Sequence, residues 1–160
     1  MDAIQQILLD VQARLGQQVP DLAYVDKDWG QLKAELPAVK FPCALLDLND
    51  IGFSQTGSGG QVADAKITVT VAHLRLTSSS LAAPRKEEAY RVIGLLAQIH
   101  EALHIFTAGD YAPLTRTRLR KVLADSSREC YEVTYQTAYM VGHDTGGSTT
   151  RISSVKLELR

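Results

Sequence analysis

One apolar stripe constrains this chain more than any other pattern, because its members recur at alternating steps of three and four residues. That spacing places them on one face of an α-helix. Pro84 stands just before the stripe, and Glu87 and Glu88 fall in the first turn, where the helix dipole favours negative charge. The sequence therefore predicts a helix over about residues 86–106 with one face made for burial. The residues of that face are Ala89, Val92, Leu96, Ile99, Leu103 and Phe106.

Most of the other patterns are strand-like and come in pairs. Apolar and polar residues alternate clearly over 62–76, and residues 42–51 read as the strand before it. These two strands predict a hairpin around the glycine-containing loop 54–60, and residues 114–124 and 129–141 predict a second hairpin. On one face of the last strand we expect Tyr131, Val133, Tyr135, Thr137 and Tyr139.

The order of elements predicts the fold class. A first helix is expected over 2–16, where apolar residues share a face, so the order is α-β-β-α-β-β. Two hairpins with one apolar face each need helices to cover that face. We therefore expect an α+β fold with a four-stranded, mostly antiparallel sheet, in one domain over 1–142. A flexible linker and a C-terminal arm would follow over 143–160.

The composition is that of an ordinary globular protein. The chain has 160 residues, 45% of them hydrophobic and 22% charged, and its formal net charge is −1. This balance favours neither a nucleic-acid-binding protein nor a disordered one. We expect no signal peptide and no membrane span, because no basic region precedes an apolar run and no apolar run is long enough. We also expect Cys43 and Cys130 to be free thiols rather than nucleophiles.

One motif resembles a metal site. His100, Glu101 and His104 follow the zincin spacing, in which two histidines four residues apart on a helix hold Zn²⁺ and the glutamate polarises a bound water. A catalytic zinc also needs a third protein ligand, and no further ligand stands at the expected spacing. We therefore expect two structural histidines, no metal and no cofactor. A small zinc-dependent hydrolase is the alternative.

One charge pattern stands out. Arg116, Arg118 and Arg120 alternate along the predicted strand 114–124, with Lys121 beside them. Strict alternation would project the three arginines on one side. A solvated strand face is the simplest interpretation; the functional one is a basic lining that meets phosphates or an acidic subunit.

The succession of elements resembles that of the tail terminator, or tail completion, proteins of long-tailed phages and prophages. The likeness rests on the N-terminal helix, the strand that begins Phe41-Pro42-Cys43-Ala44, the helix that ends Ala102-Leu103-His104, and the closing hairpin over 119–139. It covers most of residues 1–142, and the C-terminal arm lies outside it.

The resemblance implies a structural role without catalytic residues. A minor tail protein of this kind forms a homo-oligomeric ring, typically a hexamer, which caps the tail tube and offers a docking surface for head–tail joining. The implied partners are further copies of the chain, the tail tube protein and the head connector protein, without a membrane, and with DNA at most passing through the ring. The implied location is the virion tail, assembled in the host bacterial cytoplasm. Within such a ring, the stretch from Arg116 to Lys121 would line the lumen or bind a neighbour.

Two hypotheses compete with this one. The first is the zinc hydrolase that uses His100, Glu101 and His104. The second is a general binding module that uses the basic side of the second hairpin. We favour a virion assembly protein that works by self-association and is not an enzyme.

Overall fold

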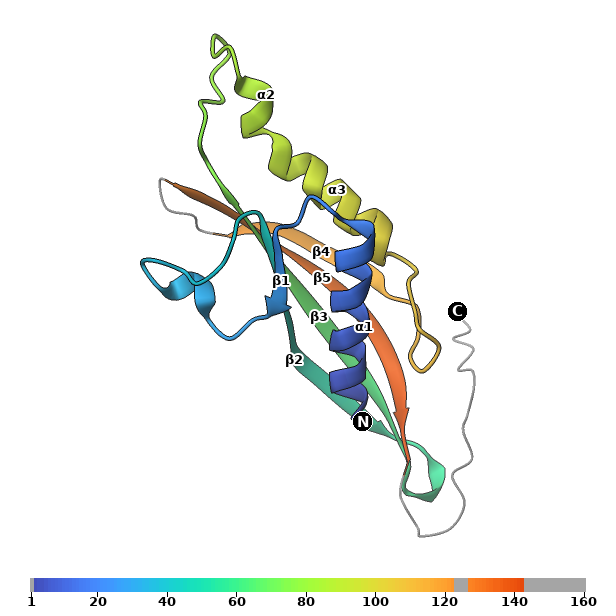
Figure 1. Cartoon of the computed structure of the whole chain (residues 1–160). Helices are drawn as coiled ribbons and strands as arrows, with labels where there is room; N and C mark the ends of the chain where they lie inside the picture. The colour runs from blue at the N-terminus through green and yellow to red at the C-terminus, as the bar shows by residue number, and fades with distance from the viewer. Residues whose placement is uncertain (1, 123–126, 143–160) are drawn as a thin grey trace.

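The sheet of this protein is built from two long hairpins and one short extra strand. The computed structural model describes residues 2–122 and 127–142. Helices α1 and α3 cross the same face of the sheet, as Figure 1 shows. The elements are α1 (Ala3–Gln18), β1 (Tyr24–Lys27), β2 (Cys43–Gln55), β3 (Gln61–Leu74), α2 (Lys86–Ala89), α3 (Arg91–Leu103), β4 (Thr115–Val122) and β5 (Arg128–Val141), with short 3₁₀ turns at Gln31–Lys33 and Gly57–Gly59.

Both predicted hairpins are confirmed. β2 pairs antiparallel with β3, and β4 pairs antiparallel with β5. β3 and β5 lie side by side in the middle, so the strand order is β1-β2-β3-β5-β4. The edges of the sheet are therefore β4 on one side, and β1 with the uncovered part of β2 on the other.

The prediction of four strands is wrong, because β1 adds a fifth. It runs parallel to β2, with Tyr24 opposite Cys43 and Lys27 opposite Leu46. Four residues without alternation carry little strand signal. The hydrogen bonds that make this segment a strand come from β2, which is almost twenty residues away in sequence.

The predicted helix over 86–106 is also wrong in its extent. It is divided at Tyr90, whose backbone angles leave the helical range, into the short α2 and the longer α3. It ends at Leu103 rather than Phe106, because His104 is extended and Ile105 has a positive φ of 64°. Phe106 still packs against the core, and the guanidinium of Arg14 lies over its ring at 5.0 Å.

The apolar stripe of α3 is buried as its spacing predicts. Val92, Leu96, Ile99 and Leu103 all lie in the interior, and the last three belong to the main core with residues of α1 and the facing sides of the central strands. The predicted side of β5 also faces this core, where Tyr135 is fully buried. The main core thus lies between two helices and one face of the sheet.

Within the described residues, the other face of the sheet is covered at one end only. There Cys43, Leu45, Ala72 and Cys130 form a small second cluster beneath residues 32–41. Both cysteines are buried thiols, and burial raises the pKa of Cys43 to about 11, so this thiol is a poor nucleophile. Beyond this cluster the face is polar, and we call it the open face. Its residues include Asp47, Asp50, Asp64, Lys66, Thr68, Thr70, Glu132, Thr134 and Gln136.

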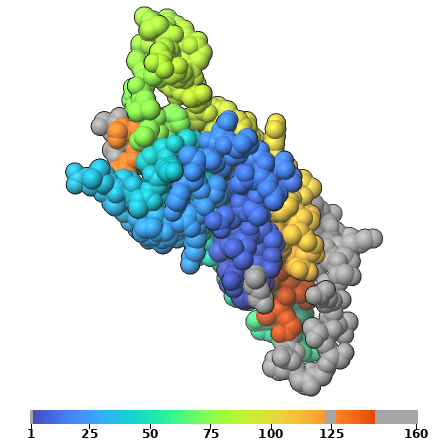
Figure 2. All heavy atoms as spheres, viewed as in Figure 1, coloured from blue at the N-terminus to red at the C-terminus, as the bar shows by residue number. Residues whose placement is uncertain are grey.

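Three further features complete the description of the fold. Among the described residues, no helix is both long and apolar enough to cross a membrane. Figure 2 shows the segment around residues 76–90, in green, projecting from one end of the molecule. Trp29, the only tryptophan of the chain, is 64% exposed, and its indole N–H donates to Asp26.

The burial pattern of α3 yields a stability prediction. Ile99 is fully buried and Ile93, on the same helix, is 49% exposed. We expect Ile99→Ala to lower the free energy of unfolding by about 2–5 kcal/mol, because it leaves a cavity in the main core. The matched control Ile93→Ala should change it by about 0.5 kcal/mol or less. Urea denaturation of both variants measures this, and equal losses would contradict the assignment of the buried face.

Candidate interaction surface

The four predicted basic residues all lie on β4, the edge strand of the second hairpin. Every residue from Thr115 to Lys121 is exposed, and Val122 is half-buried. Among the described residues, β4 has one strand partner, β5, so its other edge carries no strand. The structure therefore brings the basic residues together at an accessible edge.

The prediction that the three arginines project on one side is wrong. The register shifts between Arg116 and Arg118, which marks a β-bulge at Thr117. An extra residue in one strand moves all residues before it to the other face. Arg116 therefore lies opposite the core residue Tyr135, on the helix-covered side.

The remaining basic residues divide between the same two faces. Arg118 and Arg120 lie opposite Thr134 and Glu132, on the open face. Lys121 lies opposite Tyr131, on the helix-covered side, with its ammonium 5.8 Å from the centre of the tyrosine ring.

Two of the four charges already have partners on β5. Arg120 forms an ion pair with Glu132 at 2.7 Å, and Lys121 forms one with Glu129 at 2.8 Å. The hydrogen bond between Lys121 and Glu129 raises the pKa of the lysine and lowers that of the carboxyl group. Within residues 2–122 and 127–142, the exposed side chain of Arg118 makes no ion pair.

The two histidines of the zincin-like motif are held by neighbouring protein groups. The ring centres of His100 and His104 are 4.7 Å apart. His100 Nδ1 lies 3.4 Å from the hydroxyl of Tyr135, and His104 Nδ1 accepts from the backbone N–H of Arg116 at 3.4 Å. In the described part of the chain, no group of three histidine, cysteine, aspartate or glutamate side chains is placed to hold a metal ion. The geometry of these residues therefore offers no support to the zinc hydrolase.

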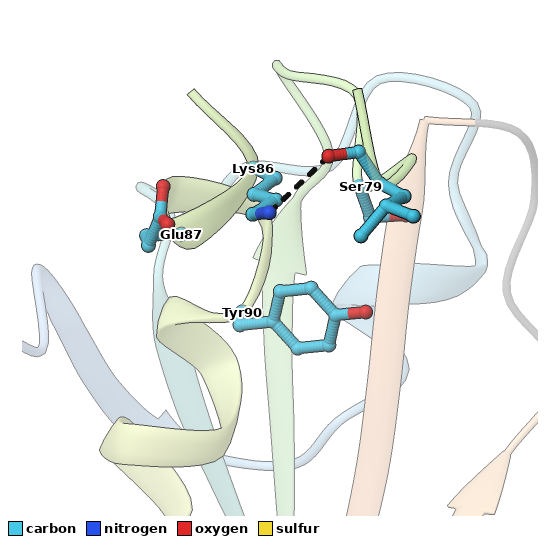
Figure 3. Close-up of a pocket in the computed structure, with 5 residues that line it drawn as sticks. Ser79, Lys86, Glu87 and Tyr90 are labelled. Carbon is cyan, nitrogen blue, oxygen red and sulfur yellow. Dashed lines mark hydrogen bonds between the residues drawn. The ribbon is translucent and has the colours of Figure 1, made fainter. Parts of the chain in front are cut away.

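Sequence reasoning missed a hollow of about 410 Å³ on the projecting segment. Figure 3 shows it beside Ser79, Lys86, Glu87 and Tyr90, with Leu81 as the fifth lining residue. The ammonium of Lys86 donates to the carbonyl oxygen of Leu81 at 3.2 Å. The sequence gives only a weak signal for this hollow, because the hollow depends on the exposed Leu81 in a serine-rich connection. The hollow is lined mainly by apolar surface.

The surroundings of His100 make stability depend on pH. Burial lowers the pKa of His100, and the nearby charges of Arg116 and His104 lower it further. Below the ordinary value of 6.5, the unfolded chain therefore binds more protons at this site than the folded chain. Above pH 6.5 the free energy of unfolding should keep its full value at this site, and it should fall as the pH drops through the lowered pKa of His100. Burial also lowers the pKa of His73, which adds to the effect.

We expect His100→Gln to reduce the loss of stability between about pH 7 and about pH 5, because it removes one of the groups responsible. Urea denaturation at several pH values measures this. The control is Gln98→Ala, which alters the same helix without removing a titratable group. A His100→Gln variant with the full pH dependence of the original chain would contradict the prediction.

Comparisons with known proteins bear on the fold. No protein-family model matches the sequence, and no curated protein matches it. Among solved structures, the fold is similar to that of a chain in the virion of a native gene transfer agent particle, with a TM-score of 0.56 and 12% sequence identity. The match covers 88% of this chain and all of the other. At this identity the likeness establishes a shared fold.

Proposed function

We propose that this chain is a structural protein of a phage-like virion and works without catalysis. The observation that carries the proposal is the fold shared with a virion chain over that chain's whole length. The match covers 88% of this chain, so the likeness is not confined to one hairpin or helix pair. The site geometry agrees, since the histidines are engaged in packing and hydrogen bonds within the described residues.

We further propose that the chain is a tail terminator, which caps the tail tube as a ring of identical subunits, with six as the expected number. The resemblance in element order supports this assignment. In this role the partners are neighbouring copies, the tail tube protein and the head connector protein, and DNA would only pass through the ring. The protein would be assembled in the host bacterial cytoplasm and reside in the virion tail.

The two edges of the sheet support self-association. Among residues 2–122 and 127–142, no strand pairs with the outer edge of β4, and β2 has a strand partner on its outer side only over Cys43–Leu46, where β1 pairs with it. Contacts between two different edges are heterologous, and such contacts form closed rings when the rotation closes. A ring of this kind needs no chemistry beyond complementary surfaces.

Assembly provides the test of the proposed function. We expect oligomers by light scattering at several protein concentrations, and rings by electron microscopy, either alone or at the ends of isolated tail tubes. Tail tubes are included because a ring can depend on the tube for its formation. A chain that stays monomeric at every concentration and does not bind tail tubes would contradict the proposal.

The domain boundary gives a second prediction. Residues 143–160 lie outside the described residues, and β5 ends at Val141, which pairs with Gln61. We propose that residues 1–142 are sufficient for the fold and that the arm serves contacts between subunits. A chain ending at residue 142 should therefore keep its circular dichroism spectrum and its midpoint of thermal unfolding. A lowered midpoint would contradict this boundary.

A further inference from the structure

We propose that β4 of one copy pairs antiparallel with the Asp47–Gln55 part of β2 in the next copy, so that the sheet continues from subunit to subunit. This contact deepens the proposed function, because it rests on self-association into a ring. The occupant of each edge is the opposite edge of a second copy.

The directions of the strands allow this contact. β2, β3, β5 and β4 are successive antiparallel neighbours, so β4 runs opposite to β2. A second copy placed beside the first in the same orientation therefore presents β2 antiparallel to β4. Its helices then lie on the same side of the continuous sheet. The lengths also match, since β4 has eight residues and the uncovered part of β2 spans nine, from Asp47 to Gln55.

β1 sets where the contact begins. It pairs with β2 as far as Leu46, whose carbonyl also accepts from the N–H of Asp28, so the first uncovered residue of β2 is Asp47. At the other end of the contact, the ring of His104 bonds the N–H of Arg116. The accessible part of β4 therefore runs from Thr117 to Val122. The register that brings the end of β4 directly up to the end of β1 on the next copy places Val122 opposite Asp47 of that copy.

In this register, residues on the open face of β4 come opposite residues on the open face of β2, and the same holds for the helix-covered side. Each edge strand contains a bulge, between Leu48 and Asp50 in β2 and between Arg116 and Arg118 in β4. Beyond the β2 bulge, Asp50 lies on the open face and Ile51 on the helix-covered side. With Val122 opposite Asp47, and the bulged residue skipped, Arg120 comes opposite Asp50.

The charges then alternate across the contact. Within one copy, Glu132 of β5 pairs with Arg120 of β4 at the β4 edge. Within the next copy, Asp50 of β2 pairs with Lys66 of β3 at the β2 edge, at 3.2 Å. Joined edge to edge, these pairs form a row of negative, positive, negative and positive side chains over four neighbouring strands. Opposite charges across strands stabilise a sheet, and like charges destabilise it.

Apolar residues meet on the helix-covered side. Leu119 on β4 is 47% exposed, and Phe53 on β2 is 54% exposed, although both side chains point toward the side where the core lies. In the same register, Leu119 comes opposite Ile51 and next to Phe53. The contact would thus remove two large apolar side chains from water.

The offset of the contact agrees with a closed sheet. Within one copy, the pairings across the sheet place Val122 level with Cys43, but in the contact Val122 lies opposite Asp47. The step is four residues, or about 13 Å, across four strands that together span about 19 Å. The resulting strand tilt is about 35°, which lies in the range that closed barrels adopt.

Charge exchange tests the contact. The pair of changes Arg120→Glu and Glu132→Lys keeps an ion pair within the copy but places like charges across the contact. We expect it to raise the concentration needed for assembly at least about tenfold. Adding Asp50→Lys and Lys66→Glu restores the alternation and should restore assembly. Circular dichroism confirms that each variant is folded, and light scattering measures assembly.

Cross-linking tests the register. A mixture of Leu119→Cys copies and Ile51→Cys copies should give a disulfide-linked dimer on oxidation, because opposite residues of antiparallel strands lie close enough for a disulfide. Either variant alone should give none. The matched control pairs Leu119→Cys with Leu36→Cys, an exposed residue that belongs to neither β4 nor β2.

The outcomes separate this contact from the proposed function. Rings that assemble regardless of the charge exchange, without the cross-link, would overturn the contact and leave the ring in place; the edge charges would then protect the sheet from aggregation. A chain that never assembles, even with tail tubes, would overturn the proposed function and the contact together. Loss of assembly, its rescue and the specific cross-link would establish the contact.

Discussion

The rest of the structure depends on the burial of the α3 stripe against one face of the sheet. A sheet of hairpins with a single apolar face is stable only when another layer covers that face. Ile99 and Leu103 supply the centre of this layer, and α1 completes it beside them. The side chain of Arg14 on α1 connects this helix to α3, since it donates a hydrogen bond to the carbonyl oxygen of Ala102. Its guanidinium also lies over the ring of Phe106.

Because α1 and α3 cover the same face of the sheet, they determine which parts of the sheet remain accessible. With both long helices on the same face, most of the opposite face is left to polar residues, and within the described part of the chain no further strand extends the sheet beyond β4 or beyond the second half of β2. The histidine pair at the end of α3 lies at the junction of helix and sheet: His100 approaches Tyr135, and the exposed His104 accepts a hydrogen bond from the N–H of Arg116 in β4. These imidazoles serve the junction between helix and sheet, whereas Arg118 and Arg120 are exposed on β4.

The bulges matter more than the charge pattern itself. Strict alternation along the chain would place the three arginines of β4 in one basic row. The bulge at Thr117 divides them, and ion pairs with β5 engage Arg120 and Lys121. On the open face this edge presents Arg118 and Arg120, the latter paired with Glu132 of β5, and on the other face it presents the exposed Leu119. In the proposed contact, this edge meets a strand of a second copy rather than phosphate.

The sequence by itself determined both hairpins, the buried face of α3 and the core-facing side of β5, because periods of two and 3.6 residues are local properties of the chain. Only the tertiary structure decided the fifth strand, the break at Tyr90 and the faces of the arginines. β1 exists through hydrogen bonds from β2, and a bulge is set by the register between two strands. Neither is encoded in the periodicity of one segment, so no local pattern could have predicted which arginines share a face.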